Sequence, residues 1–174
     1  MSKGIKTYIF VYIIYIMRIS ILIFLLLSLC NSGIAQNNRM GDNQMLKLVN
    51  DVRSKGCNCG DTYMPPAPAL KWNDKLKKAA WLHSNDMNSK NYFNHVSPNG
   101  RSTPRTRLHK AKYNWSATAE NIAYGQMTVK ELVKGWIDSP SHCLNIMNPV
   151  YTEMGSAVKG IYWTQVFGKP KAKK

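Results

Sequence analysis

The sequence predicts a single α+β domain that follows an N-terminal export signal. Three observations indicate this arrangement. An apolar run fills residues 8–29, helical apolar periodicity recurs in three later segments, and two segments near the C-terminus have the composition of paired strands. Of the 174 residues, those after the apolar run suffice for one hydrophobic core, and no internal repeat divides them.

Residues 1–35 have the features of a secretory signal. Arg18 precedes the most apolar stretch, and the segment ends in Gly33-Ile34-Ala35, whose small residues suit cleavage after Ala35. Met17 is an alternative start. Two other interpretations stay open: an uncleaved membrane anchor, and a lipid-modified Cys30, although the leucine before Cys30 is large for a lipoprotein signal. With cleavage, no stable membrane span remains, and we expect an exported, secreted or cell-surface or periplasmic monomer.

The chain is strongly basic. Its formal net charge of +15 falls to +12 when Lys3, Lys6 and Arg18 are removed with the signal. Part of this charge lies in the tail, residues 169–174, which we expect to be solvated. No nucleic-acid-binding motif accompanies the basic residues, so they indicate attraction to anionic cell surfaces and no nucleic-acid partner.

Three helices are predicted from periodicity. The first covers residues 43–55, where apolar residues recur at helical spacing between a cap at Asp42 and a stop at Gly56. A second begins at Asn73 and runs to about Asn88 or Lys90. The third follows Thr128, because Thr128 and Glu131 have the spacing of a capping box. Between the first two, residues 57–70 are rich in Gly and Pro and predict an ordered loop or strap.

The exported part of the chain contains three cysteines, Cys57, Cys59 and Cys143. An oxidising compartment favours a disulfide, and residues 57 and 59 are poorly placed to bridge each other. Cys143 is therefore expected to pair with either Cys57 or Cys59, which leaves one free thiol. A zinc site made of all three cysteines and His142 is a weaker alternative, because the spacing matches no standard zinc motif.

Two further segments bring charged or titratable side chains next to apolar residues. His95 follows an aromatic pair and precedes a turn at residues 97–100, and Glu120 lies among small and apolar residues in a predicted strand, residues 115–125. A half-buried carboxylate needs donors or a metal, since otherwise its pKa rises. His83, on the apolar face of the second helix, is interpreted as a structural residue. The basic stretch 101–112 is interpreted as a solvated face.

Residues 136–149 predict a junction between two helices. Pro140 cannot continue the helix that contains Trp136, but it suits the first position of a new helix, with Ser139 free to cap the exposed amides. His142 then lies in the first turn of the new helix. After this junction, residues 155–159 and 161–167 flank Gly160 and predict a β-hairpin.

In this order and spacing, several motifs make the chain resemble the CAP (SCP-like) superfamily of cysteine-rich secretory and pathogenesis-related proteins, in its bacterial branch. The resemblance covers roughly residues 46–168, within an expected domain of residues 36–168. The motifs that carry it are Trp72-Asn73, Phe93-Asn94-His95-Val96-Ser97, Ala119-Glu120-Asn121-Ile122-Ala123, Ser139-Pro140-Ser141-His142, Asn145-Ile146-Met147-Asn148-Pro149 and Tyr162-Trp163-Thr164-Gln165-Val166-Phe167-Gly168.

The resemblance implies a three-layer α-β-α sandwich with a surface cleft where histidines and acids converge. His95 and Glu120 match cleft residues of the family. The family's second acid and second histidine are replaced by Ser139 and Tyr162, which puts the full four-residue site in doubt. His142 is the expected substitute for the missing histidine, and Asp138 can replace the acid only if it points inward.

Two functions are compatible with such a cleft. The first is an extracellular binding module for a lipid, glycan or protein ligand. The alternative is a peptidase-like hydrolase, in which His95, Glu120 and His142 serve as an acid–base site or His95 and His142 hold a divalent metal such as zinc. Asp138, Ser139 and Tyr162 are further candidate binding residues. The sequence contains no convincing activated nucleophile.

Overall fold

The computed structural model describes residues 17, 19–20 and 41–172. The expectations for a signal peptide, its cleavage and Cys30 therefore lie almost wholly outside the described residues. The chain divides into two compact units, residues 1–40 and 41–174, and the second contains every element discussed below. Within the described residues, no helix combines the length and the apolar character needed to cross a membrane.

The second unit contains helices and strands in mixed order. The first helix is described from residue 41 to residue 53. The elements that follow it are β1 (Cys57–Cys59), β2 (Thr62–Met64), β3 (Lys71–Trp72), α2 (Asp74–Lys90), α3 (Pro104–Lys110), β4 (Trp115–Tyr124), α4 (Val129–Asp138), α5 (Pro140–Met147), β5 (Glu153–Lys159) and β6 (Tyr162–Pro170).

A four-stranded sheet forms the centre of this unit. Its strand order is β3-β5-β6-β4, in which β3 and β5 are parallel and the other neighbours antiparallel. Strands β5 and β6 form the predicted hairpin, and Gly160 in its turn has a φ of 60°. That left-handed conformation favours glycine, because a side chain would clash with the backbone.

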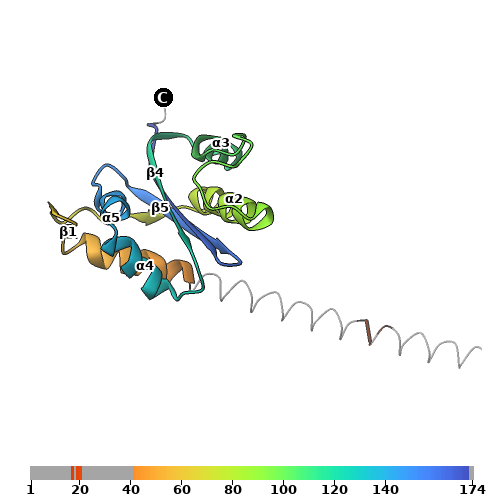
Figure 1. Cartoon of the computed structure of the whole chain (residues 1–174), viewed down its shortest axis with the longest axis horizontal. Coiled ribbons are helices and arrows are strands. Elements are labelled where there is room, and N and C mark those ends of the chain that lie inside the picture. The colour runs from red at the N-terminus through yellow and green to blue at the C-terminus, as the bar shows by residue number, and fades with distance from the viewer. Residues whose placement is uncertain (1–16, 18, 21–40, 173–174) are drawn as a thin grey trace, which may run out of the picture. The chain divides into compact units, whose positions relative to one another are not determined.

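Helices cover both faces of the sheet, so the expected α-β-α sandwich is confirmed (Figure 1). Helix α2 packs on β5 and β6 from one side, and Gly155 permits the close approach, since a Cβ there would clash with the backbone of Lys77. On the other side, the first helix, α4 and α5 enclose the main core. Its buried members include Val49, Leu132, Trp136, Ile146, Met154 and Phe167.

Helices α2 and α4 begin at the predicted capping residues, whereas the first helix does not. The Asn73 side chain accepts hydrogen bonds from the amides of Lys75 and Leu76, and Thr128 and Glu131 form the reciprocal capping box. Such caps satisfy amides that have no partner within the helix. The first helix ends at residue 53, two residues earlier than predicted. Asp42 lies inside that helix and forms an ion pair with Lys77.

The loop after the first helix differs from the prediction, because it contains a short antiparallel hairpin of β1 and β2. Buried Arg53 holds this segment in place. It donates hydrogen bonds to the carbonyl oxygens of Pro68, Ile146 and Asn148, and thereby connects the first helix to the following loop and to the end of α5. Residues 57–70 are therefore an ordered strap, as expected, with added strand structure.

Candidate functional site

Glu120 is the centre of a buried charged cluster. It lies on β4 opposite Val166 of β6, and its side chain is only 4% exposed. Arg107 Nη2 donates to both carboxylate oxygens, at 3.1 and 2.9 Å. His95 Nδ1 lies 2.9 Å from Oε1, and His83 Nδ1 lies 3.1 Å from Oε2. The carboxylate therefore has the donors that its sequence environment required.

These contacts determine the charge of Glu120. Burial alone would raise the pKa of the carboxyl, because it disfavours the charged form. The close polar contact of His83, the hydrogen bond from His95 and the charges of His83 and Arg107 outweigh burial and lower the pKa to about 2. Glu120 is thus an anion at neutral pH and a poor proton acceptor.

Arg107 corrects the interpretation of residues 101–112 as a solvated face. The short helix α3 directs this guanidinium inward, where it is almost fully buried and also donates to the backbone oxygens of His95 and Ser102. Arg107 therefore holds both the Glu120 carboxylate and the segment that carries His95. No periodic signal in the sequence indicates this inward position, because α3 is only seven residues long.

His95 is the exposed member of the cluster, with a side chain 48% exposed. Because an ionised carboxylate only accepts, the contact with Glu120 places a proton on Nδ1 and leaves the other ring nitrogen, Nε2, with no protein partner among the described residues. A cavity of about 210 Å³ is lined by His95, Arg107, Glu120, Thr118 and apolar residues. His95 thus combines an unpartnered ring nitrogen with a position at the edge of a small cavity.

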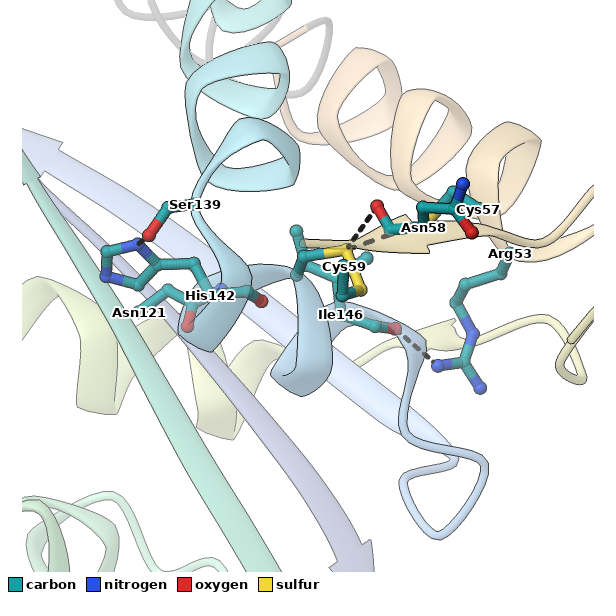
Figure 2. The surroundings of a disulfide bond; sticks show 9 residues. Arg53, Cys57, Asn58, Cys59, Asn121, Ser139, His142 and Ile146 are labelled. Atoms are coloured by element: carbon teal, nitrogen blue, oxygen red, sulfur yellow. Dashed lines mark hydrogen bonds between the residues drawn. A yellow bond between two sulfur atoms is a disulfide. The ribbon is translucent and has the colours of Figure 1, made fainter. Parts of the chain in front are cut away.

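His142 lies close enough to His95 for the two charges to interact. Burial lowers the pKa of His142, and the positive charge of His95 lowers it further. Its Nδ1 lies 2.9 Å from the Ser139 hydroxyl, and its backbone oxygen accepts from the Asn121 side chain (Figure 2). Ser139 was expected to cap α5, but its side chain forms no capping bond and contacts His142 instead.

The other two candidate binding residues lie in different surroundings. Asp138 is exposed and pairs with Lys134, one helical turn earlier, so it does not point inward as a replacement acid would need to. The Tyr162 ring is buried against Tyr124, and its hydroxyl donates to the Asn91 side chain. The exposed rings of Phe93 and Tyr124 contact each other, and Phe93 is close in sequence to His95.

The potential metal-ligand atoms near His95 do not suit a catalytic zinc ion. Such sites commonly use three protein ligands and one open position. Arg107, His83 and His95 already occupy the Glu120 oxygens, which leaves two imidazole nitrogens as candidate ligands. Among residues 17, 19–20 and 41–172, one group brings three potential metal-ligand atoms of His, Cys, Asp or Glu within 4.8 Å of one another. It consists of Cys57, Cys59 and Cys143. His142 is not part of it.

The three sulfurs lie where β1 meets α5. Cys59 and Cys143 form a disulfide, so Cys143 pairs with one of the two expected partners and Cys57 keeps a free thiol. The Cys57 sulfur lies 3.6 Å from the Cys143 sulfur. Figure 2 shows Cys57, Asn58 and Cys59 on the strand that faces α5. Because Cys59 and Cys143 are bonded to each other, they do not act as thiolate ligands in this state.

A separate groove of about 720 Å³ lies between the first helix and α4. Its wall is mainly apolar and includes Leu48, Val52, Val133 and Ile137, and charged side chains surround it. A larger hollow of about 900 Å³ around Trp72, Tyr113 and Glu153 has a more polar wall and contains neither His95 nor His142. Of these two large concavities, the groove is therefore the one suited to an apolar ligand.

The sandwich, the buried Glu120 cluster and the disulfide define a disulfide-linked α-β-α domain. Residues 46–167 match the family model of the cysteine-rich secretory protein (CAP) family. Because this match covers more than half of the chain, the protein belongs to the CAP family, as the sequence motifs indicated.

Bacterial proteins are among its relatives. The uncharacterized protein YkwD of Bacillus subtilis (strain 168) is 40% identical over 100 residues, which cover 56% of this chain and 38% of that protein. The uncharacterized membrane protein YlbC of the same strain is 33% identical over 128 residues, which cover 74% of this chain and 34% of that protein. The chain thus spans little more than a third of the curated relatives that it matches.

Solved structures with this fold include extracellular and surface proteins. An extracellular protein with an SCP domain from Bacillus anthracis superposes with a TM-score of 0.66 at 30% identity, over 75% of this chain and 41% of that chain. An outer surface protein from Borrelia burgdorferi shares the fold, with a TM-score of 0.58 at 22% identity over 74% and 89% of the two chains.

Proposed function

We propose that this protein is exported and acts outside the cell as a binding module for an anionic single-chain amphiphile, such as a fatty acid. The observation that carries the proposal is the apolar groove between the first helix and α4. The extracellular and surface location of proteins with the same fold, and the signal-like residues 1–35, support export.

The volumes of the groove and of the cavity beside His95 favour ligand binding at the groove. Pockets that hold small-molecule ligands commonly have volumes of about 300–1,000 Å³ and mainly apolar walls. The groove has a volume of about 720 Å³, whereas the cavity beside His95 has only about 210 Å³. An alkyl chain fits the groove, and burying each methylene there contributes about 0.8 kcal/mol.

The charges around the groove favour an anionic head group. Asp51 is paired with Lys47, and Lys134 is paired with Asp138, so these charges are balanced. Lys55 and Lys130 also line the groove, and neither has an ion pair among residues 41–172. Glu131 accepts the Thr128 capping bonds and keeps its negative charge. With three lysines and two acids, the lining of the groove has an excess of one positive charge.

Reversing the charge of Lys130 is expected to weaken the binding of a fluorescent 16-carbon fatty acid. Lys130→Glu replaces attraction by repulsion at an exposed site, which corresponds to about a fivefold rise in Kd, or ~1 kcal/mol. Fluorescence titration at low ionic strength measures it. The matched control is Lys159→Glu, the same change at the end of β5, away from the groove.

Three outcomes have separate meanings. Equal weakening in Lys130→Glu and Lys159→Glu indicates a general charge effect and contradicts the groove as the binding site. Saturable binding of the fatty acid that is lost in Ile137→Lys supports the groove as the binding site, because this substitution places a charge in the apolar wall. If neither the fatty acid nor the alcohol of the same chain length binds, the proposed ligand class is wrong.

A hydrolase remains the second candidate, and the orientation of His95 favours it. Glu120 holds Nδ1 of His95, Nε2 has no protein partner among the described residues, and the charge of His95 is felt by His142, an arrangement in which His95 can act as a general base. Turnover of a peptide or cell-wall library that is lost in His95→Ala, but kept in the surface variant Lys159→Ala, supports an enzyme. Equal turnover in both variants excludes His95 as its base.

A further inference from the structure

We propose that Cys57, Cys59 and Cys143 form an internal thiol–disulfide exchange site, in which Cys143 pairs alternately with Cys59 and Cys57. The disulfide joins Cys59 and Cys143, whose Cα atoms are 5.3 Å apart. The free thiol of Cys57 lies 3.6 Å from the Cys143 sulfur, which is van der Waals contact. All three sulfurs lie within 4.8 Å of one another. This site is independent of the ligand proposed for the groove.

The hairpin presents both cysteines to the same partner. Alternate residues of a strand point to the same face, and Figure 2 shows Cys57 and Cys59 on β1. The sulfurs of both contact the Cys143 sulfur on α5. The hairpin is seated directly on α5, since a Cβ at Gly60 would lie 3.0 Å from the Pro140 ring. Neither pairing therefore requires β1 and α5 to move far apart.

The exchange is balanced without an added oxidant. The Cys57 thiolate attacks the Cys143 sulfur, a Cys57–Cys143 bond forms, the Cys59–Cys143 bond breaks, and Cys59 leaves as a thiolate that takes up the proton lost by Cys57. Attack is most favourable when the three sulfurs are collinear, and a collinear array would separate the outer two by more than ~5 Å. Since they lie within 4.8 Å, the Cys57 side chain must first rotate.

The environment of Cys57 sets the pH at which exchange proceeds. Burial raises the pKa of its thiol, so the reactive thiolate is scarce at neutral pH and becomes more abundant as the pH rises. The charged groups around the same groove are Asp51 from the first helix, Lys55 from the turn that follows it, and Lys130, Glu131 and Lys134 from α4. We therefore expect slow exchange near neutral pH and fast exchange in alkaline solution.

Exchange would move the free thiol. Cys57 lines the groove between the first helix and α4, whereas Cys59 is buried in the main core. After exchange, the groove wall carries a disulfide sulfur, and the free thiol lies in the core, where reagents reach it poorly. The pairing state thus determines whether the groove contains a reactive thiol.

The test is disulfide mapping of the protein purified from cells that express the full chain. Samples held between about pH 6 and pH 8.5 are quenched with acid, alkylated and digested with pepsin, and cross-linked peptides are identified by mass spectrometry. The expected result is Cys59–Cys143 in fresh samples, and Cys57–Cys143 that forms at a rate rising about tenfold per pH unit. Finding Cys59–Cys143 alone at every pH overturns the proposal.

Two matched variants give an independent readout. With oxidised glutathione as the oxidant, Cys59→Ala is expected to form Cys57–Cys143, and Cys57→Ala to retain Cys59–Cys143 under all conditions. If Cys59→Ala folds and keeps Cys57 and Cys143 as thiols, the proposal is wrong. If that variant does not fold, the maps of the unmodified protein decide the question, because they need no substitution.

Discussion

Replacing Glu120 by Gln is expected to lower the free energy of unfolding by about 3–5 kcal/mol, since removing one partner of a buried ion pair leaves an uncompensated charge. Arg107 is almost fully buried, and its guanidinium would face a neutral amide. Buried His83 would lose the same countercharge. Urea denaturation followed by circular dichroism measures the change.

The matched control for this substitution is Glu131→Gln. It removes the same charge from an exposed side chain, and Gln can still close the capping box, so a much smaller loss of stability than for Glu120→Gln is expected. Adding Arg107→Met to Glu120→Gln should recover part of the loss, because the unpaired charge is then removed as well. Similar costs for Glu120→Gln and Glu131→Gln would contradict the assigned role of the cluster.

The same cluster makes stability depend on pH in a defined direction. The pKa of Glu120 is lowered from 4.5 to about 2 in the folded protein, so its contribution is complete above about pH 4.5 and is lost as the pH falls toward 2. The shift corresponds to roughly 3 kcal/mol. The difference in stability between the unmodified protein and Glu120→Gln should therefore be smaller at about pH 2.5 than at about pH 6. An equal difference at both pH values would contradict the lowered pKa of Glu120.

The sequence predicted the elements whose signals are local. Apolar periodicity located the three long helices, capping residues located the starts of α2 and α4, and the turn at Gly160 located the β5–β6 hairpin. The β1–β2 hairpin was missed, because each strand has only three residues and the segment's Gly and Pro content favours a loop. Its position depends on contacts with α5 that are distant in sequence.

The candidate site was predicted only in part, for the same physical reason. The apolar surroundings of Glu120 indicated that it needs donors, but they could not identify Arg107 and His83 as those donors. His83 was correctly interpreted as a hydrogen-bonded core residue, since its Nε2 contacts the Asn94 carbonyl oxygen. Its contact with Glu120 follows from the packing of α2 against the sheet, which no spacing within α2 reveals.

Removing the disulfide with Cys143→Ala is expected to lower the free energy of unfolding by about 2–5 kcal/mol. The bond joins residues 84 positions apart, and closing so long a loop restricts the unfolded chain substantially. Urea denaturation under oxidising conditions measures the loss. A dithiol reductant should bring the unmodified protein to about the same stability as Cys143→Ala, because both lack the cross-link.

The two remaining cysteine variants separate a fixed disulfide from an exchanging one. Cys57→Ala should change stability by less than about 1 kcal/mol, because a partly exposed thiol outside the cross-link is removed. Cys59→Ala should cost clearly less than Cys143→Ala, since Cys57 can then close a loop of nearly the same length with Cys143. Equal losses in Cys59→Ala and Cys143→Ala would mean that Cys57 cannot replace Cys59. Cys143 would then have a single partner despite its contact with both sulfurs.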